Sequence, residues 1–253
     1  ISTPYKLRQE MLEKMPKDFW ESPKKVFEPC CGKGGFVIDI VDLFMKNLKI
    51  DNEEERYKII VEQCLYFSDI NPTNIFICKL LINPCDDYKL NYNEGNTLEL
   101  DIKDKWGIDG FDAVIGNPPY VRTKKGNLYI DFTEKCYNLL DTNGELIFIV
   151  PSDFLKLTSA SKLLNVMMTN GTFTHIFHPH NEKMFENASI DVIVFRYCKN
   201  SLIDKKVLYN DKLLYITNSN GLITFGEEEN NNSVMIQDYF DIYVGLVTGK
   251  EEV

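Results

Sequence analysis

Apolar runs typical of buried strands alternate along this chain with segments of helical periodicity. The run from Phe111 to Gly116 has the first pattern, and Val37, Ile40, Val41 and Phe44 give the second. Alternation of this kind predicts an α/β fold with a doubly wound, mostly parallel sheet. We expect strands near residues 25–29, 64–69, 89–93, 111–116, 144–150, 172–178 and 190–197, and helices near 5–15, 34–47, 71–83, 128–141 and 158–170.

The pattern changes after Lys199. Three short apolar segments around 207–209, 213–216 and 222–225, with a turn at Asn218-Ser219-Asn220-Gly221, predict antiparallel strands. We therefore expect a main domain over residues 1–199 and a β-rich extension over residues 200–253.

The tetrapeptide Asn117-Pro118-Pro119-Tyr120 follows the strand that ends at Gly116. Ligands of open α/β sheets bind at the carboxyl ends of the strands. Two prolines fix the backbone and remove two N–H donors, so the Asn117 amide oxygen and the Pro118 carbonyl remain as rigid acceptors. Such a pair suits a planar –NH2 group, and the ring of Tyr120 can stack on the flat system that carries it. The plain alternative is a strand end with a Pro-Pro turn and a packing tyrosine.

An amine on an aromatic ring is a poor nucleophile because its lone pair is delocalised. Two acceptors outside the ring plane favour a pyramidal nitrogen, and they bind the transition state better than the flat ground state. An activated methyl group then needs only in-line positioning. The motif therefore predicts methyl transfer to an amine, without a general base or a metal.

A second motif lies upstream, where a strand at 25–29 runs into Cys30-Cys31-Gly32-Lys33-Gly34-Gly35-Phe36 and then a helix. Glycines let the backbone approach a ligand, and a helix N-terminus offers free N–H groups. The spacing is not Gly-x-Gly-x-x-Gly, which argues against a dinucleotide site. Asp69 ends the next expected strand, where a carboxylate can bind the two hydroxyls of a ribose, or cap the helix from Pro72, or both.

Further segments follow in order: Ser2-Thr3-Pro4 precedes the glycine-rich turn, and Gly95-Asn96-Thr97-Leu98 precedes the catalytic strand. Gly144 to Pro151 has the pattern of a core strand, and Met184-Phe185-Glu186-Asn187 precedes another. With these motifs the chain resembles the S-adenosylmethionine-dependent DNA adenine-N6 methyltransferases of the gamma arrangement, as in type II and type IIG restriction–modification systems.

The resemblance implies a Rossmann-like class I methyltransferase with seven strands, the last antiparallel. It implies catalytic roles for Asn117, Pro118, Pro119 and Tyr120, and stacking of a flipped-out adenine on Tyr120 and Phe185. The family usually has an aspartate at Asn96, so the contact with the cofactor's adenine is open there. The cofactor-binding residues that it implies are Thr3, Pro4, Glu28, Pro29, Cys30, Gly32, Gly34, Phe36, Asp69, Ile70, Asn96, Thr97 and Asn117.

The expected activity is methylation of the N6 amine of adenine in DNA. RNA adenine and protein glutamine are alternative acceptors, since related enzymes use the same motif on other amines and amides. A catalytically inactive, nucleic-acid-binding subunit is an alternative of another class, which the intact Gly32, Gly34, Asn117 and Tyr120 disfavour.

The net charge of −10 is unusual for a DNA-binding protein. Arg122, Lys124 and Lys125 form a small basic segment beyond the catalytic motif that we expect near the DNA backbone, although an exposed turn would look the same. Val244 to Gly249 resembles the entry to a target-recognition domain. We therefore expect that such a domain, or a partner subunit, supplies sequence recognition and positive charge.

Seven cysteines without framework spacing suggest free thiols in a reducing compartment. His175, His178 and His180 lie close together, but no thiol or carboxylate completes a metal site, and we expect them near the substrate instead. No apolar stretch approaches the ~20 residues of a membrane span, and no secretion signal is recognisable. We expect a cytoplasmic protein that binds no metal and no membrane.

Overall fold

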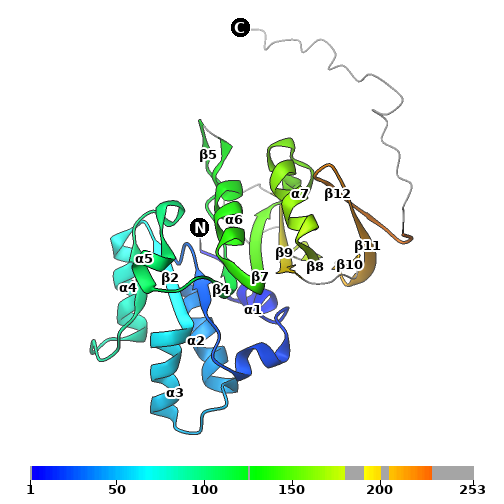
Figure 1. The fold of residues 1–253 in the computed structure, drawn as a ribbon. Coiled ribbons are helices and arrows are strands. Elements are labelled where there is room, and N and C mark those ends of the chain that lie inside the picture. The colour runs from blue at the N-terminus through cyan, green and yellow to red at the C-terminus, as the bar shows by residue number, and fades with distance from the viewer. Residues whose placement is uncertain (1, 125, 180–190, 201–204, 230–253) are drawn as a thin grey trace, which may run out of the picture.

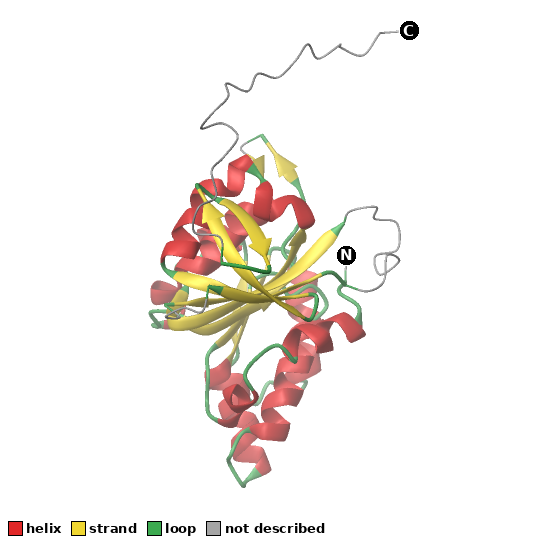
Figure 2. Cartoon of the chain, turned by 90° about the vertical axis from the view of Figure 1, so that its right-hand side faces the viewer, coloured by secondary structure: helices red, strands yellow, loops and turns green. Residues whose placement is uncertain are grey.

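The computed structural model describes residues 2–124, 126–179, 191–200 and 205–229, and its centre is a twisted sheet with helices on both faces (Figures 1 and 2). The strands of this sheet are β1 Val26–Glu28, β2 Leu65–Asp69, β3 Asn91–Glu94, β4 Phe111–Gly116, β7 Leu140–Pro151, β8 Gly171–Phe177, β9 Val192–Lys199, β10 Lys206–Tyr209, β11 Lys212–Ser219 and β12 Leu222–Gly226. A small hairpin, β5 Arg122–Thr123 and β6 Gly126–Asn127, stands apart from it.

The strand order is β12-β11-β10-β8-β9-β7-β4-β1-β2-β3. Strands β3, β2, β1, β4 and β7 are parallel neighbours, and β9 runs antiparallel to both β7 and β8. The chain moves outward from β1 to β3 and then crosses back to β4. The boundary between β1 and β4 is therefore the topological switch point, where α/β sheets bind their ligands.

The described residues form seven α-helices, and three of them, α3, α4 and α5, begin at a side-chain cap. Helix α4 starts with Asn71 as N-cap and Pro72 in its first turn, and α5 ends at Gly107 in the left-handed conformation. None of the helices described is long and apolar enough to cross a membrane. They are α1 Tyr5–Leu12, α2 Gly35–Asn47, α3 Glu53–Ile59, α4 Pro72–Ile82, α5 Ile102–Trp106, α6 Leu128–Asn138 and α7 Ser161–Thr169.

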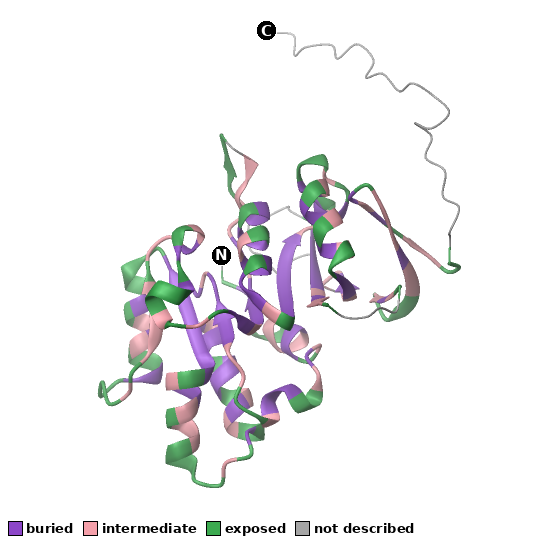
Figure 3. Ribbon diagram, in the orientation of Figure 1, coloured by how far each residue is buried: buried purple, intermediate pink, exposed green. Residues whose placement is uncertain are grey.

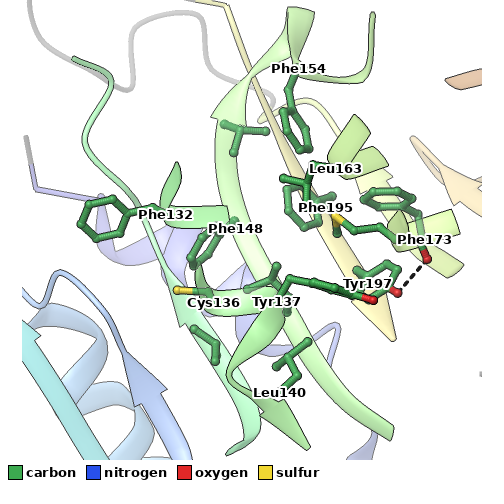
Figure 4. Close-up of a cluster of buried hydrophobic side chains, with 14 of the residues drawn as sticks. Phe132, Cys136, Tyr137, Leu140, Phe148, Phe154, Leu163, Phe173, Phe195 and Tyr197 are labelled. Atoms are coloured by element: carbon green, nitrogen blue, oxygen red, sulfur yellow. Dashed lines mark hydrogen bonds between the residues drawn. The ribbon is translucent and has the colours of Figure 1, made fainter. Parts of the chain in front are cut away.

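The central strands are buried on both faces, as Figure 3 shows in purple. Side chains along β7 alternate between two clusters: Leu146 and Phe148 join the one under α6 and α7, whereas Ile147 and Ile149 join the one under α1 and α2. This period of two is the geometry of a strand, and it explains the continuous apolar run. In the first cluster aromatic rings pack closely, and the hydroxyl of Tyr197 donates to the carbonyl oxygen of Met167 at 2.8 Å (Figure 4).

The class I methyltransferase fold and its antiparallel last core strand agree with the prediction. The three C-terminal strands extend the main sheet, because β10 pairs in parallel with β8 and β11 and β12 follow as antiparallel neighbours. Helices α3 and α5 were not predicted, since each is short and only partly amphipathic. The acidic run that begins at Glu53 forms the first turn of α3, where negative charge is favourable.

Candidate active site

Two adjoining cavities lie at the carboxyl ends of β1 and β4. The larger has a volume of about 690 Å³ and the smaller about 320 Å³. Cys30, Gly32, Asn74 and Asn117 line both, so the glycine-rich turn and the catalytic motif face the same space. The remaining residues of the larger cavity that the sequence singled out are Pro29, Asp69, Ile70, Asn96, Thr97, Pro118, Pro119 and Tyr120. Those of the smaller are Thr3, Glu28 and Phe36.

Asn117 is oriented by a neighbour from the N-terminal segment. Its amide nitrogen donates to the hydroxyl oxygen of Thr3 at 3.1 Å, and its backbone carbonyl accepts from the Cys30 thiol at 3.1 Å. In the described part of the chain, no hydrogen bond reaches the amide oxygen. The Asn117 amide nitrogen is thus engaged in a hydrogen bond, whereas the amide oxygen is available to accept one from a ligand.

Tyr120 is held at both ends of its side chain. Its hydroxyl donates to the carbonyl oxygen of Ile149 at 3.1 Å, and its ring meets Tyr129 edge-on with 6.2 Å between centroids. Burial raises the pKa of the Tyr120 phenol above its ordinary value, so the hydroxyl stays protonated at neutral pH. Tyr120 therefore offers a fixed ring and no base to the cavity.

The glycine-rich turn brings the backbone over the cavity before α2 begins. Gly34, the N-cap of α2, has φ +82°, and a Cβ there would lie 3.0 Å from the Cys78 sulfur. Both facts restrict the position to glycine. No side chain of the described residues caps α2, and its first turn holds no acidic residue, so its N-terminal N–H groups remain available to a ligand.

Glu28 is an unusual buried acid in the smaller cavity. It is 3% exposed, and among the residues that the structure describes its Oε2 atom has no hydrogen-bond partner. Burial, with smaller contributions from Cys78 and Asp69, raises the pKa of Glu28 well above its ordinary value of 4.5. A buried carboxyl without a partner is costly, and a cationic ligand would satisfy it. The cofactor's ammonium group has the required charge, so this wall of the cavity fits S-adenosylmethionine.

Asp69 closes the end of β2 over the larger cavity. One carboxylate oxygen accepts from the Gly32 N–H at 2.8 Å and the other from the Asn71 N–H at 2.8 Å. Each oxygen keeps a further lone pair, which is what two ribose hydroxyls need. The alternative of Asp69 as helix cap is wrong in detail, because the Asn71 side chain caps α4 by accepting from Thr73.

Asn96 and Thr97 lie at the end of β3. Asn96 caps a short 3-10 helix: its Oδ1 accepts from Leu98 N–H at 3.1 Å and its Nδ2 donates to Glu99 at 2.9 Å. Thr97 is buried, donates to the Pro29 carbonyl at 2.6 Å and lies 2.7 Å from the Ser68 hydroxyl. These bonds fix the glycine-rich turn to the tips of its neighbouring strands.

Several residues of the site escaped the sequence reasoning. Four apolar side chains, Val121, Leu128, Phe132 and Val192, line the larger cavity although they match no polar motif. A signal existed for Leu128 and Phe132, because they are four residues apart at the start of the helix that follows the catalytic motif. Asn74 and Arg8 gave no signal. From the sequence alone, a polar residue on a helix that faces a cavity looks the same as one that faces solvent.

Other predicted residues lie apart from the cavities or outside the described residues. Arg122 and Lys124 are exposed in the β5–β6 hairpin. Lys125, His180 and Phe185 lie outside the described residues. His175 and His178 line neither cavity, so the structure does not bring them together with the other predicted site residues. His175 lies on β8 opposite Leu208 of β10, and His178 follows β8, where its backbone N–H donates to the side-chain oxygen of Asn210 at 2.8 Å. The described residues hold no group of three or more potential metal ligands.

Comparison with known proteins identifies the family to which the sequence is similar. The family model of the Eco57I restriction-modification methylases matches residues 49–185. The type II methyltransferase M.HincII of Haemophilus influenzae is 33% identical over 123 residues, which is 40% of this chain and 24% of that protein. The type II methyltransferase M.AccI of Acinetobacter calcoaceticus is 26% identical over 210 residues, 74% of this chain and 34% of that protein. The chain thus spans only a quarter to a third of the length of these relatives.

Solved structures share the fold at low sequence identity. A protein of Listeria monocytogenes described as a class I S-adenosylmethionine-dependent methyltransferase superposes with a TM-score of 0.63 at 16% identity, over 82% of this chain and 64% of that one. The methyltransferase subunit of a type I restriction-modification system from Streptococcus thermophilus gives 0.63 at 15% identity, over 82% and 46%. These likenesses show the class I methyltransferase fold.

Proposed function

Because the chain belongs to the Eco57I restriction-modification methylase family, we propose that it transfers a methyl group from S-adenosylmethionine to the N6 amine of adenine in DNA. The observation that carries this proposal is the pair of joined cavities. Asn117 borders both, with its amide nitrogen already bonded and its amide oxygen available.

The cofactor would occupy the smaller cavity with its methionine part and extend into the larger with its adenosine. Glu28 would accept from the ammonium group, Asp69 from the ribose hydroxyls, and Thr3 and Pro4 would cover the methionine end. Ile70, Asn96 and Thr97 line the larger cavity and would border the adenine ring. Bound there, S-adenosylmethionine supplies an electrophilic methyl group on its sulfonium.

The target adenine would enter the rest of the larger cavity after leaving the DNA stack. Asn117 Oδ1 and the Pro118 carbonyl would accept the two hydrogens of its amine, and Tyr120 would lie against its ring. The apolar side chains of Leu128, Phe132 and Val192 would exclude water around it. The lone pair of the amine would form the new N–C bond as the bond between the methyl carbon and the sulfonium sulfur breaks, which leaves the neutral thioether S-adenosylhomocysteine. The surplus proton on the methylated nitrogen would then pass to solvent.

Contacts with the DNA backbone would come from the hairpin that follows the catalytic motif. Arg122 and Lys124 are exposed there, beside the mouth lined by Val121. The chain's net charge of −10 makes two cations a weak basis for DNA affinity. Further positive charge and sequence recognition would therefore come from a target-recognition domain or a partner subunit, and Phe185 would supply the second stacking ring.

Nucleoside mass spectrometry tests the proposal. The full-length gene is expressed in cells that lack endogenous adenine methyltransferases, beside an Asn117→Ala control. We expect N6-methyladenine in DNA from the wild-type culture alone. N6-methyladenine in RNA, or methylglutamine in protein, with unmodified DNA would favour the alternative acceptors. No modification, together with no binding of S-adenosylhomocysteine by the purified chain, would favour an inactive subunit.

A further inference from the structure

Arg8 lies in the smaller cavity, although no motif marks it. It belongs to α1, and its side chain crosses the start of α2, where a Cβ on Gly35 would come within 2.9 Å of the guanidinium carbon. Its Nε donates to Asp39 at 2.6 Å and its Nη1 to the Thr3 carbonyl at 2.7 Å. Only 15% of the Arg8 side chain is exposed, and 5% of Asp39. The guanidinium is therefore held in place before any ligand arrives.

The bonds to Asp39 and Thr3 use two of the five N–H donors of this guanidinium. In the described part of the chain no further hydrogen bond engages the remaining donors. The uncapped N-terminus of α2 lies beside them, and its first turn carries no acidic residue. A rigid guanidinium with free donors next to free helix N–H groups is suited to a carboxylate.

Glu28 lines the same cavity with the opposite charge. It is 3% exposed, and within the described ranges its Oε2 has no partner and it makes no hydrogen bond to Arg8. Arg8 is near enough to lower the pKa of Glu28, against the larger upward effect of burial. The cavity of about 320 Å³ is also lined by Lys33, which is exposed, so Arg8 is its largely buried cation. A cavity that presents a fixed, largely buried cation and an unsatisfied acid matches a zwitterion, such as the α-amino acid end of a larger ligand.

On the basis of the function proposed above, we propose that Arg8 binds the α-carboxylate of the cofactor's methionine moiety. Asp39 and the Thr3 carbonyl fix the guanidinium for this role. The contact makes Arg8 a specificity residue, because it separates a cofactor with its amino acid tail from adenosine thioethers that lack the carboxylate.

A ligand pair tests this without any DNA. Isothermal titration of the complete chain compares S-adenosylhomocysteine with its decarboxylated analogue, which differs only by the missing carboxylate. The variant is Arg8→Met. The matched control is Lys6→Met, which removes an exposed charge from the same helix but touches neither cavity. Because Arg8→Met leaves Asp39 buried without its partner, the double variant Arg8→Met/Asp39→Leu is measured as well, and thermal unfolding verifies that each variant is folded.

We expect Arg8→Met and the double variant to weaken S-adenosylhomocysteine about 10- to 100-fold. The affinity for the decarboxylated analogue should change by less than about threefold in both variants. Lys6→Met should leave the affinity for both ligands unchanged. Equal weakening of both ligands, or unchanged affinity for S-adenosylhomocysteine, would overturn the role of Arg8 while leaving the proposed function intact. Failure of the wild-type chain to bind either ligand would contradict the proposed function and this inference together.

Discussion

The amide nitrogen of Asn117 donates to the hydroxyl of Thr3 across 3.1 Å, joining two residues that are 114 positions apart in the chain. Thr3 is in turn held by Arg8, which donates to its carbonyl. The N-terminal segment thus sets which half of the Asn117 amide faces the cavities.

Thr3→Val tests this relationship. Without the hydroxyl, Asn117 loses the partner that distinguishes its nitrogen from its oxygen, and the amide can rotate. We expect the single-turnover rate of methyl transfer by the full-length protein to fall about tenfold, the loss of one hydrogen bond. Thr3→Ser keeps the hydroxyl and should keep the rate within about threefold. Equal rates for the valine and serine variants would refute the positioning role.

Glu28→Gln should change how stability depends on pH. Burial raises the pKa of Glu28 above 4.5, so its contribution to stability is fully present below the unfolded-state pKa and is lost as pH rises through the folded-state pKa. Without ligand, the wild type should therefore lose free energy of unfolding relative to Glu28→Gln from about pH 5 upward. Urea denaturation of both proteins measures the difference. A difference that stays constant from about pH 5 to about pH 8 would contradict the raised pKa.

Bound S-adenosylhomocysteine should reverse that trend, since its ammonium group favours the ionised carboxylate. We expect the affinity of the wild type for S-adenosylhomocysteine to rise with pH over the same interval. The affinity of Glu28→Gln should be lower and should depend less on pH. Titration calorimetry at matched pH values provides the comparison.

Thr97→Val should destabilise the tips of three strands. Thr97 donates to the Pro29 carbonyl and lies beside the Ser68 hydroxyl, which accepts from Asn93 at 3.0 Å. Valine leaves buried polar groups unpaired, at a cost of about 1–3 kcal/mol in the free energy of unfolding. Thr97→Ser retains the bonds and should cost less than half as much in urea denaturation. Equal losses would indicate that the lost methyl packing, and not the hydrogen bonds, matters.

Arg122→Ala and Lys124→Ala should weaken DNA binding without affecting S-adenosylhomocysteine. Each phosphate contact that is lost lowers the slope of log affinity against log salt by about 1. Lys46→Ala is the matched control, because Lys46 is an exposed cation near the C-terminal end of α2, away from the cavities at its other end. Fluorescence anisotropy of labelled DNA over a salt series gives both slope and affinity. Slopes that match the control would exclude the hairpin from the DNA contact.

Much of the fold follows from local sequence. The alternation of apolar strands and helices predicts the sheet, because a strand segment buried on both faces is apolar throughout, as residues 113–116 of β4 and 146–150 of β7 are. The glycine-rich turn and the Asn-Pro-Pro-Tyr motif predict the two sides of the site, since the ends of parallel strands meet at one edge.

The remaining parts depend on contacts that sequence spacing does not encode. Nothing in the local sequence distinguishes Arg8 from other charged residues of a helix. Its role depends on the packing of α1 against α2, where it bonds to Asp39, 31 positions away in the chain. The sequence leaves the contact of Asn96 with the cofactor's adenine open, and it does not indicate that the Asn96 amide caps a short helix of its own segment. His175 lies on β8 and His178 follows it, beside β10, and no local pattern indicates that β10 pairs with β8.

The most direct measurement of the central claim is single-turnover transfer from methyl-labelled S-adenosylmethionine to unmethylated DNA, by full-length wild type and Asn117→Ala. The account predicts label on N6 of adenine with the wild type and a rate at least about 100-fold lower with the variant, at similar affinity for S-adenosylhomocysteine. Label on another base, or an undiminished rate with Asn117→Ala, would contradict it.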